Sequence, residues 1–137
     1  MEHLNEFIAV NWVMVLMWVF LLGMIVNSFL KSGYDISPQE IVQLMSHEDG
    51  SVIVDVREDN EYQSGHIKDS IHIPLSKLSS RLGELDNYKA NNVILSCRSG
   101  SRSGRACGML KKKGFAKVHN LRGGVLAWEN DNLPMQK

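Results

Sequence analysis

The chain has 137 residues, which is room for one ordinary domain and little more. It carries 15 Lys and Arg against 15 Asp and Glu, so its formal net charge is zero, which argues against a general nucleic-acid binder. Its two cysteines, Cys97 and Cys107, are too few for a disulfide framework, and no Cys-x-x-Cys or Cys/His cluster predicts a metal site.

The segment from Phe7 to Leu30 contains no charged residue and is bounded by Glu6 and Lys31. As a helix it would be about 36 Å long, which exceeds the roughly 30 Å hydrocarbon core of a bilayer. The pattern therefore predicts a transmembrane helix within residues 1–30, followed by a domain that occupies residues 31–137.

Two other interpretations of this segment fit less well. A cleaved signal peptide would have a basic start and a small-x-small cleavage site, whereas this N-terminus carries Glu2 and Glu6. A soluble helix that is apolar on every face would need a larger core than this chain can build. We expect a single-pass anchor in the lipid bilayer, and Lys31 after the span predicts that the domain faces the cytoplasm.

Strand and helix patterns alternate through the rest of the chain. The expected strands are Tyr34–Ile36, Ser51–Val54, Ile71–Ile73, Asn92–Ser96 and Lys117–Leu121. The expected helices are Pro38–His47, Asp59–Gln63, Leu75–Leu85, Arg102–Lys113 and Gly124–Asn130. This order predicts an α/β fold with a small five-stranded parallel sheet and helices on both faces, and with sites at the carboxyl ends of the strands.

A cysteine stands at such a strand end. Cys97 follows the apolar strand Asn92–Ser96 and opens a loop that leads into a helix, so backbone N–H groups and the helix N-terminus can surround its sulfur. Two loop arginines add positive charge, and Gly100 permits the backbone to converge. These effects favour the thiolate and predict a nucleophile in an anion-binding loop. The loop residues are Arg98, Ser99, Gly100, Ser101, Arg102 and Ser103.

In these motifs the chain resembles a single-domain rhodanese, a sulfurtransferase whose six-residue loop starts at the catalytic cysteine. Further matching motifs are Asp55-Val56-Arg57, Glu61-Tyr62, Gly65-His66-Ile67, Ile71-His72-Ile73-Pro74, Gly114-Phe115 and Leu121-Arg122-Gly123-Gly124 with Trp128. One departure is Asp69-Ser70-Ile71, where many members have Pro-Gly-Ala. A span followed directly by this domain resembles a group of bacterial membrane-anchored rhodanese-like proteins, which implies the inner membrane.

The resemblance implies a mechanism without metal or organic cofactor. Cys97 would take a sulfane sulfur from a donor such as thiosulfate or a persulfide, hold it as a persulfide, and pass it to cyanide or to the thiol of a small molecule or a protein. Asp55 and Arg57 would support the active-site loop, as in the family.

Two other functions are weighed against this one. A cysteine phosphatase would have five residues between the cysteine and its arginine, whereas four separate Cys97 from Arg102. A membrane-tethered persulfide carrier or protein-binding module with little thiosulfate activity stays open, because a fold does not determine a function. For Cys107, in the following helix, we expect a buried packing role, with a resolving thiol as the alternative.

Overall fold

The computed structural model describes the backbone of all 137 residues, and the side chains of all but residues 8 and 29–32. The chain divides into two compact units, Met1–Gly33 and Tyr34–Lys137. The side chain of Lys31, on which the expected orientation depends, lies outside the described residues.

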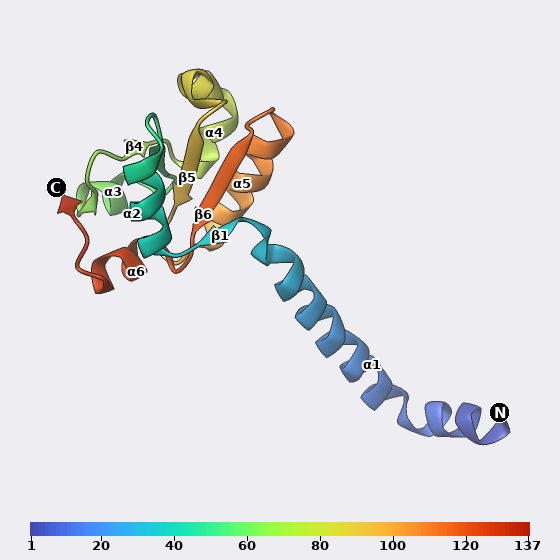
Figure 1. Cartoon of the computed structure of the whole chain (residues 1–137). Coiled ribbons are helices and arrows are strands. Elements are labelled where there is room, and N and C mark those ends of the chain that lie inside the picture. Colours follow the sequence, from blue (N-terminus) through green and yellow to red (C-terminus); the bar gives the residue numbers. More distant parts are fainter. The chain divides into compact units, whose positions relative to one another are not determined.

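The first unit contains helix α1 (Glu2–Leu30), which leads into the 3-10 helix η1 (Lys31–Tyr34). Asn11 interrupts α1 with non-helical angles (φ −113°, ψ 23°), and its side-chain amide donates a 3.0 Å hydrogen bond to the carbonyl of Phe7. This break is visible in Figure 1. The part that is long and apolar enough to cross a membrane is Ala9–Ser28, with a mean hydropathy of 2.3, slightly shorter than the expected span.

The second unit is built on a five-stranded parallel sheet in the order β1-β6-β5-β2-β4, so the predicted α/β fold is confirmed. The strands are β1 (Asp35–Ile36), β2 (Val52–Asp55), β4 (Ile71–His72), β5 (Asn92–Ser96) and β6 (Lys117–Leu121). Of the three central strands, β2 and β5 are buried throughout and carry runs of three apolar residues, whereas β6 is more polar but is buried at Val118, Asn120 and Leu121.

Helices cover both faces of this sheet (Figure 1). On one face α2 (Pro38–His47) and α6 (Gly124–Asn130) pack over a core that contains Ile41, Ile94 and Trp128. The expected capping box at the start of α2 is present, with Ser37 and Glu40 bonding reciprocally. The opposite face is covered by α4 (Leu75–Arg81), the 3-10 helix η2 (Leu82–Tyr88) and α5 (Ser101–Lys112).

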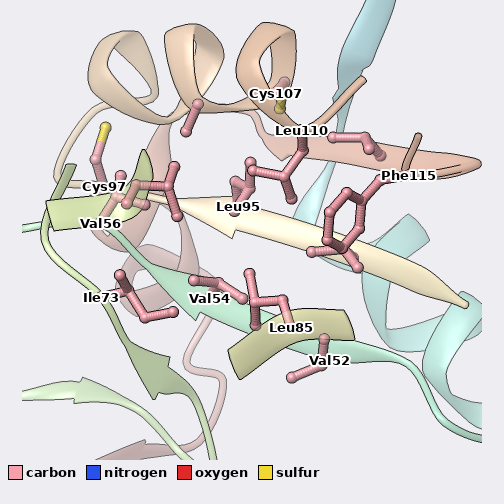
Figure 2. Close-up of a cluster of buried hydrophobic side chains, with 14 residues drawn as sticks. Val52, Val54, Val56, Ile73, Leu85, Leu95, Cys97, Cys107, Leu110 and Phe115 are labelled. Atoms are coloured by element: carbon pink, nitrogen blue, oxygen red, sulfur yellow. The ribbon is translucent and has the colours of Figure 1, made fainter. Parts of the chain in front are cut away.

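The second core is drawn in Figure 2. It joins alternate residues of β2 and β5, among them Val54 and Leu95, to the buried face of α5. Cys97 is part of this cluster, at the end of β5, and Cys107 lies on α5 beside Leu110. The sheet and α5 therefore hold the expected site loop between two rigid elements.

Apart from shifts of one residue at the ends of β1, β2, β4 and α5, two features differ from the sequence-based expectation. The helix expected over Leu75–Leu85 changes at Leu82 into the 3-10 helix η2. The leucine spacing does not distinguish the two, because leucines three residues apart share a face in either type of helix. The short strands β3 (His66–Ile67) and β7 (Met135–Gln136) pair antiparallel outside the main sheet and were not expected. Two-residue strands are too short to show an alternating pattern. The helix α3 (Asp59–Gln63) has the expected bounds.

Candidate active site

The loop between β5 and α5 is wound tightly around the sulfur of Cys97. The amide nitrogen of Gly100 lies 3.0 Å from the Cys97 Sγ and donates a hydrogen bond to it. Gly100 has φ +102°, a left-handed conformation that residues with a side chain rarely adopt. An added Cβ there would also lie 3.3 Å from the carbonyl oxygen of Leu121. The glycine therefore allows the loop to turn back onto the sulfur.

The first turn of α6 binds the same loop from the other side. The amide of Val125 donates to the Cys97 carbonyl at 2.8 Å, and the amide of Leu126 donates to the Arg98 carbonyl at 3.2 Å. This approach requires Gly124, which has φ +62°, because an added Cβ would overlap the carbonyl groups of both loop residues. Gly123-Gly124 thus brings the N-terminus of α6 against the backbone of the loop.

The environment of Cys97 favours its thiolate. The residue is buried, with 0% of its surface exposed. Burial raises the pKa of the Cys97 thiol, but hydrogen bonds from the Ser103 side chain and from the backbone amides of Ser103, Gly100 and Ser99 lower it by more. The pKa therefore lies below its ordinary value, as expected for a nucleophile rather than a structural cysteine.

The two loop arginines have different surroundings. Arg102 forms a two-pronged ion pair with Glu61 of α3, with both N–O distances at 2.8 Å. Arg98 is exposed, and among the described residues its guanidinium has no hydrogen-bond partner. Arg98 is therefore the loop arginine whose charge is available to an incoming anion, whereas the charge of Arg102 is compensated within the protein.

The three loop serines also differ. Ser103 is buried on α5, with its hydroxyl oxygen 3.3 Å from the Cys97 sulfur. Ser99 and Ser101 have exposed side chains, and Ser99 acts on the sulfur through its backbone amide. Only Ser103 of the three directs a side-chain group at the Cys97 sulfur.

Asp55 and Arg57 are buried, but, contrary to expectation, their side chains do not hydrogen-bond to the loop. The Arg57 guanidinium donates to both carboxylate oxygens of Asp55, at 2.8 to 3.1 Å, and to the Gly65 carbonyl at 2.7 Å. Within the described part of the chain, neither side chain hydrogen-bonds to residues 97–103. The pair instead ties the end of β2 to the turn after α3, and so supports the helix that carries Glu61.

A cleft of about 160 Å³ opens beside the loop. Its lining includes Arg57, Glu61, Arg98, Leu126 and Glu129, so Arg98, which has no partner among the described residues, lies in a cleft that also contains acidic groups. A larger cleft of about 360 Å³, lined in part by Gly50–Ile53 at the start of β2, contains none of the loop residues. Of the two clefts, only the smaller one is lined by a loop residue, Arg98, and Cys97 is not part of its lining.

Cys107 lies apart from this chemistry. It is buried on the inner face of α5, and burial raises the pKa of its thiol to about 12. A thiol with this pKa stays protonated at neutral pH and is a poor nucleophile. The surroundings of Cys107 therefore match the packing role expected for it.

Three residues near the loop carried no assigned role in the sequence analysis. Glu61 was noted only as part of a motif, whereas Asn120 and Asp35 were not singled out. A usable signal existed for Asn120, because it is a polar residue near the end of β6, the strand that neighbours β5. The carboxyl ends of neighbouring parallel strands lie at the same edge of a sheet.

Comparison with known proteins identifies relatives of the chain. The family described as "Rhodanese-like domain" matches residues 37–131. A protein of Allochromatium vinosum named sulfurtransferase is 34% identical over 101 residues, covering 74% of this chain and 92% of the relative. The Escherichia coli K12 protein named uncharacterized protein YibN is 31% identical over 140 residues, covering 98% of this chain and 97% of the relative.

The fold also has counterparts among solved structures. The crystal structure of a thiosulfate sulfurtransferase from Pseudomonas aeruginosa superposes with a TM-score of 0.67 and 27% identity. The match covers 75% of this chain and 20% of that protein, so the likeness concerns one domain of a longer chain.

Proposed function

Because the chain belongs to the rhodanese-like family, whose domain matches residues 37–131, we propose that it is a sulfurtransferase that carries the transferred sulfur on Cys97. The observation that supports this role is the geometry of the loop, in which the Gly100 amide lies 3.0 Å from a sulfur whose pKa is lowered. A thiolate prepared in this way needs no general base to become a nucleophile.

The proposed loading step uses thiosulfate or a persulfide as donor. The Cys97 thiolate attacks the outer sulfur of thiosulfate, the sulfur–sulfur bond of the donor breaks, and sulfite leaves with the bonding electron pair. Cys97 then carries a persulfide whose negative charge lies on its terminal sulfur, so charge is conserved. The loop amides stabilise that charge as the donors of an oxyanion hole would.

The proposed unloading step returns the enzyme to its starting state. The thiolate of a small thiol or of a protein, or cyanide, attacks the terminal sulfur of the persulfide. The bond between the two persulfide sulfurs breaks, and Cys97 leaves as a thiolate. This two-stage sequence is ping-pong catalysis through a covalent intermediate. It gives Arg98 the role of attracting an anionic donor to the cleft.

We further propose that α1 anchors the domain in the bacterial inner membrane as a single span, with the domain facing the cytoplasm. The apolar stretch Ala9–Ser28 supports the anchor. The distribution of basic residues supports the orientation, because Lys31 follows the span and no Lys or Arg stands before it in residues 1–8. The Escherichia coli relative aligns over 98% of this chain, so its similarity extends into this segment.

Mass spectrometry of the purified full-length chain tests the proposal. After exposure to thiosulfate, or to a small persulfide, we expect a gain of one sulfur atom located on Cys97. The Cys97→Ser variant should gain none, because a serine hydroxyl is not ionised at neutral pH and forms no persulfide. The Cys107→Ala variant is the matched control and should load normally.

The same experiment separates the alternative functions. A protein that loads from a persulfide but does not turn over thiosulfate would be the sulfur carrier considered above. If Cys97 gains no sulfur from either donor, the proposed function is wrong, and a binding module becomes the better interpretation.

A further inference from the structure

The hydroxyl of Ser103 lies between two groups that can accept its hydrogen. Its oxygen is 3.3 Å from the Cys97 sulfur and 2.5 Å from the side-chain oxygen Oδ1 of Asn120. Ser103 and Asn120 are both buried, at 0% and 4% exposure. No bulk water therefore competes for these contacts, and the hydrogen bonds within the group determine where the hydrogen lies.

The orientation of the Asn120 amide follows from its other partners. Its nitrogen Nδ2 lies 2.8 Å from a carboxylate oxygen of Asp35 and 3.0 Å from the carbonyl oxygen of Gly100. Both of these groups only accept hydrogen bonds. The atom that faces them must therefore be the NH₂ group, and the oxygen of the amide faces Ser103.

One hydroxyl hydrogen cannot serve two acceptors fully. If Ser103 donates to the Cys97 thiolate, the Ser103 and Asn120 oxygens face each other at short range without a hydrogen between them. If Ser103 donates to Asn120, the sulfur loses its only side-chain donor among the described residues. Resting on the proposed nucleophilic role of Cys97, we propose that Asn120 is a positioning residue that competes with the Cys97 thiolate for the hydrogen of Ser103.

This competition acts differently on the two states of the proposed cycle. In the free enzyme the negative charge lies on the Cys97 sulfur, which attracts the Ser103 hydrogen away from Asn120. In the persulfide the charge lies on the terminal sulfur, and the hydrogen returns to the Asn120 oxygen. Asn120 therefore raises the free energy of the thiolate relative to the persulfide and favours loading of the enzyme.

A double-mutant cycle tests the competition directly. The four proteins are the parent, Asn120→Leu, Ser103→Ala and the double variant, all full-length in detergent and all carrying Cys107→Ala. The pKa of Cys97 is measured from the ultraviolet absorbance of its thiolate. A hydrogen bond to a charged group corresponds to about one pKa unit, so Ser103→Ala should raise the pKa by about that amount. Asn120→Leu should lower it by a similar amount.

The double variant isolates the part that passes through Ser103. Without the hydroxyl, removal of Asn120 has no hydrogen to release, so the fall in pKa on Asn120→Leu should be about one unit smaller with alanine than with serine at position 103. Asn120→Leu also deprives Asp35 and the Gly100 carbonyl of their donor, but it does so equally with and without the hydroxyl. The surrounding charged groups are unchanged in all four proteins: Asp35 on β1, Asp55 at the end of β2, Arg57 after β2, Glu61 on α3, Arg98 in the loop and Arg102 on α5.

The opposite result would overturn the proposal. If Asn120 only holds the loop in shape, Asn120→Leu will raise the pKa of Cys97 toward its ordinary value, or shift it equally with serine and alanine at position 103. Circular dichroism checks that each variant is folded. If Asn120→Leu is not folded, the smaller substitution Asn120→Ala takes its place in the same cycle, with the same expected signs.

A second measurement keeps this proposal distinct from the proposed function. With thiosulfate and sulfite held at a fixed ratio, the ratio of persulfide to thiol in Asn120→Leu should fall about tenfold below the parent. If the parent gains no sulfur at all, the proposed function fails, while the titration still decides the sharing of the hydrogen. If the parent loads sulfur but the cycle shows no coupling, the inference about Asn120 alone fails.

Discussion

Arg102 and Glu61 are 41 positions apart in the sequence, yet each of two guanidinium nitrogens lies 2.8 Å from a different oxygen of the carboxylate. The hydrogen bonds from Arg102 lower the pKa of Glu61 to about 2, so the pair stays ionised at all physiological pH values. The pair joins α3 to the first turn of α5, which continues the Cys97 loop. It also leaves Arg98 as the loop arginine without a partner among the described residues.

This division of roles predicts different kinetics for the two arginines. Arg98→Gln should raise the KM for thiosulfate roughly fivefold and change kcat little, since an exposed charge contributes up to about 1 kcal/mol. Adding salt should reduce the difference between the variant and the parent, because salt screens exposed charges. Steady-state kinetics at two ionic strengths measure both effects.

Arg102→Ala is the comparison for that experiment. It should lower kcat, because the loop loses its link to α3, while loading of Cys97 continues through the backbone amides. An increase in KM equal to that of Arg98→Gln, with kcat unchanged, would mean that Arg102 binds the donor after all.

Gly124→Ala should destabilise the protein by roughly 3 kcal/mol, as large steric changes in a packed interior do. The new Cβ would overlap the Cys97 and Arg98 carbonyl groups at a backbone position with φ +62°. Gly108→Ala on α5 is the matched control, since an added Cβ there meets nothing within 4 Å. It should be neutral or stabilising by about 1 kcal/mol. Chemical denaturation compares the two, and equal stabilities would contradict the close approach of α6 to the loop.

The buried thiol of Cys107 predicts a loss of stability at alkaline pH. Its pKa is raised to about 12 in the folded chain, against about 8.5 in an unfolded chain. The unfolded state therefore releases this proton first, and the free energy of unfolding should fall by up to about 1.4 kcal/mol per pH unit between these values. Below about pH 8.5 the contribution is fully present.

The Cys107→Ala variant lacks this pH dependence of the free energy of unfolding, so comparison with the parent measures it. The difference in unfolding free energy between parent and variant should shrink as the pH rises from about 8 to about 11. Other groups that titrate in this range are common to both proteins and cancel in the difference. A difference independent of pH would show that the Cys107 thiol titrates normally and is not enclosed.

The apolar helix predicts how the chain behaves in a cell. Because Ala9–Ser28 can span a bilayer, the full-length chain should remain in the membrane fraction after an alkaline carbonate wash, whereas a chain that starts at Tyr34 should be soluble. With the domain in the cytoplasm, protease added to spheroplasts should leave it intact until the membrane is opened. Release by carbonate would reject the anchor, and digestion of the domain in sealed spheroplasts would reverse the orientation.

Local patterns in the sequence were sufficient to predict most of the elements and the position of Cys97. The Ser37 to Glu40 capping box, the apolar run of β5 and the glycine at position 100 each act through neighbouring residues, so a short stretch of chain reveals them. The same holds for the electropositive setting of the cysteine, because the amides that surround its sulfur belong to the next six residues.

Contacts between distant residues were decided only by the tertiary structure. The sequence supplied two loop arginines, but only the packing of α3 beside α5 pairs Arg102 with Glu61 and leaves Arg98 available. No sequence pattern links Asp35 to Cys97, and Asn120 is marked only by its place near a strand end; the order of the strands brings both residues beside the loop. A side chain's partner across the fold depends on sheet order and helix packing, which are properties of the whole chain.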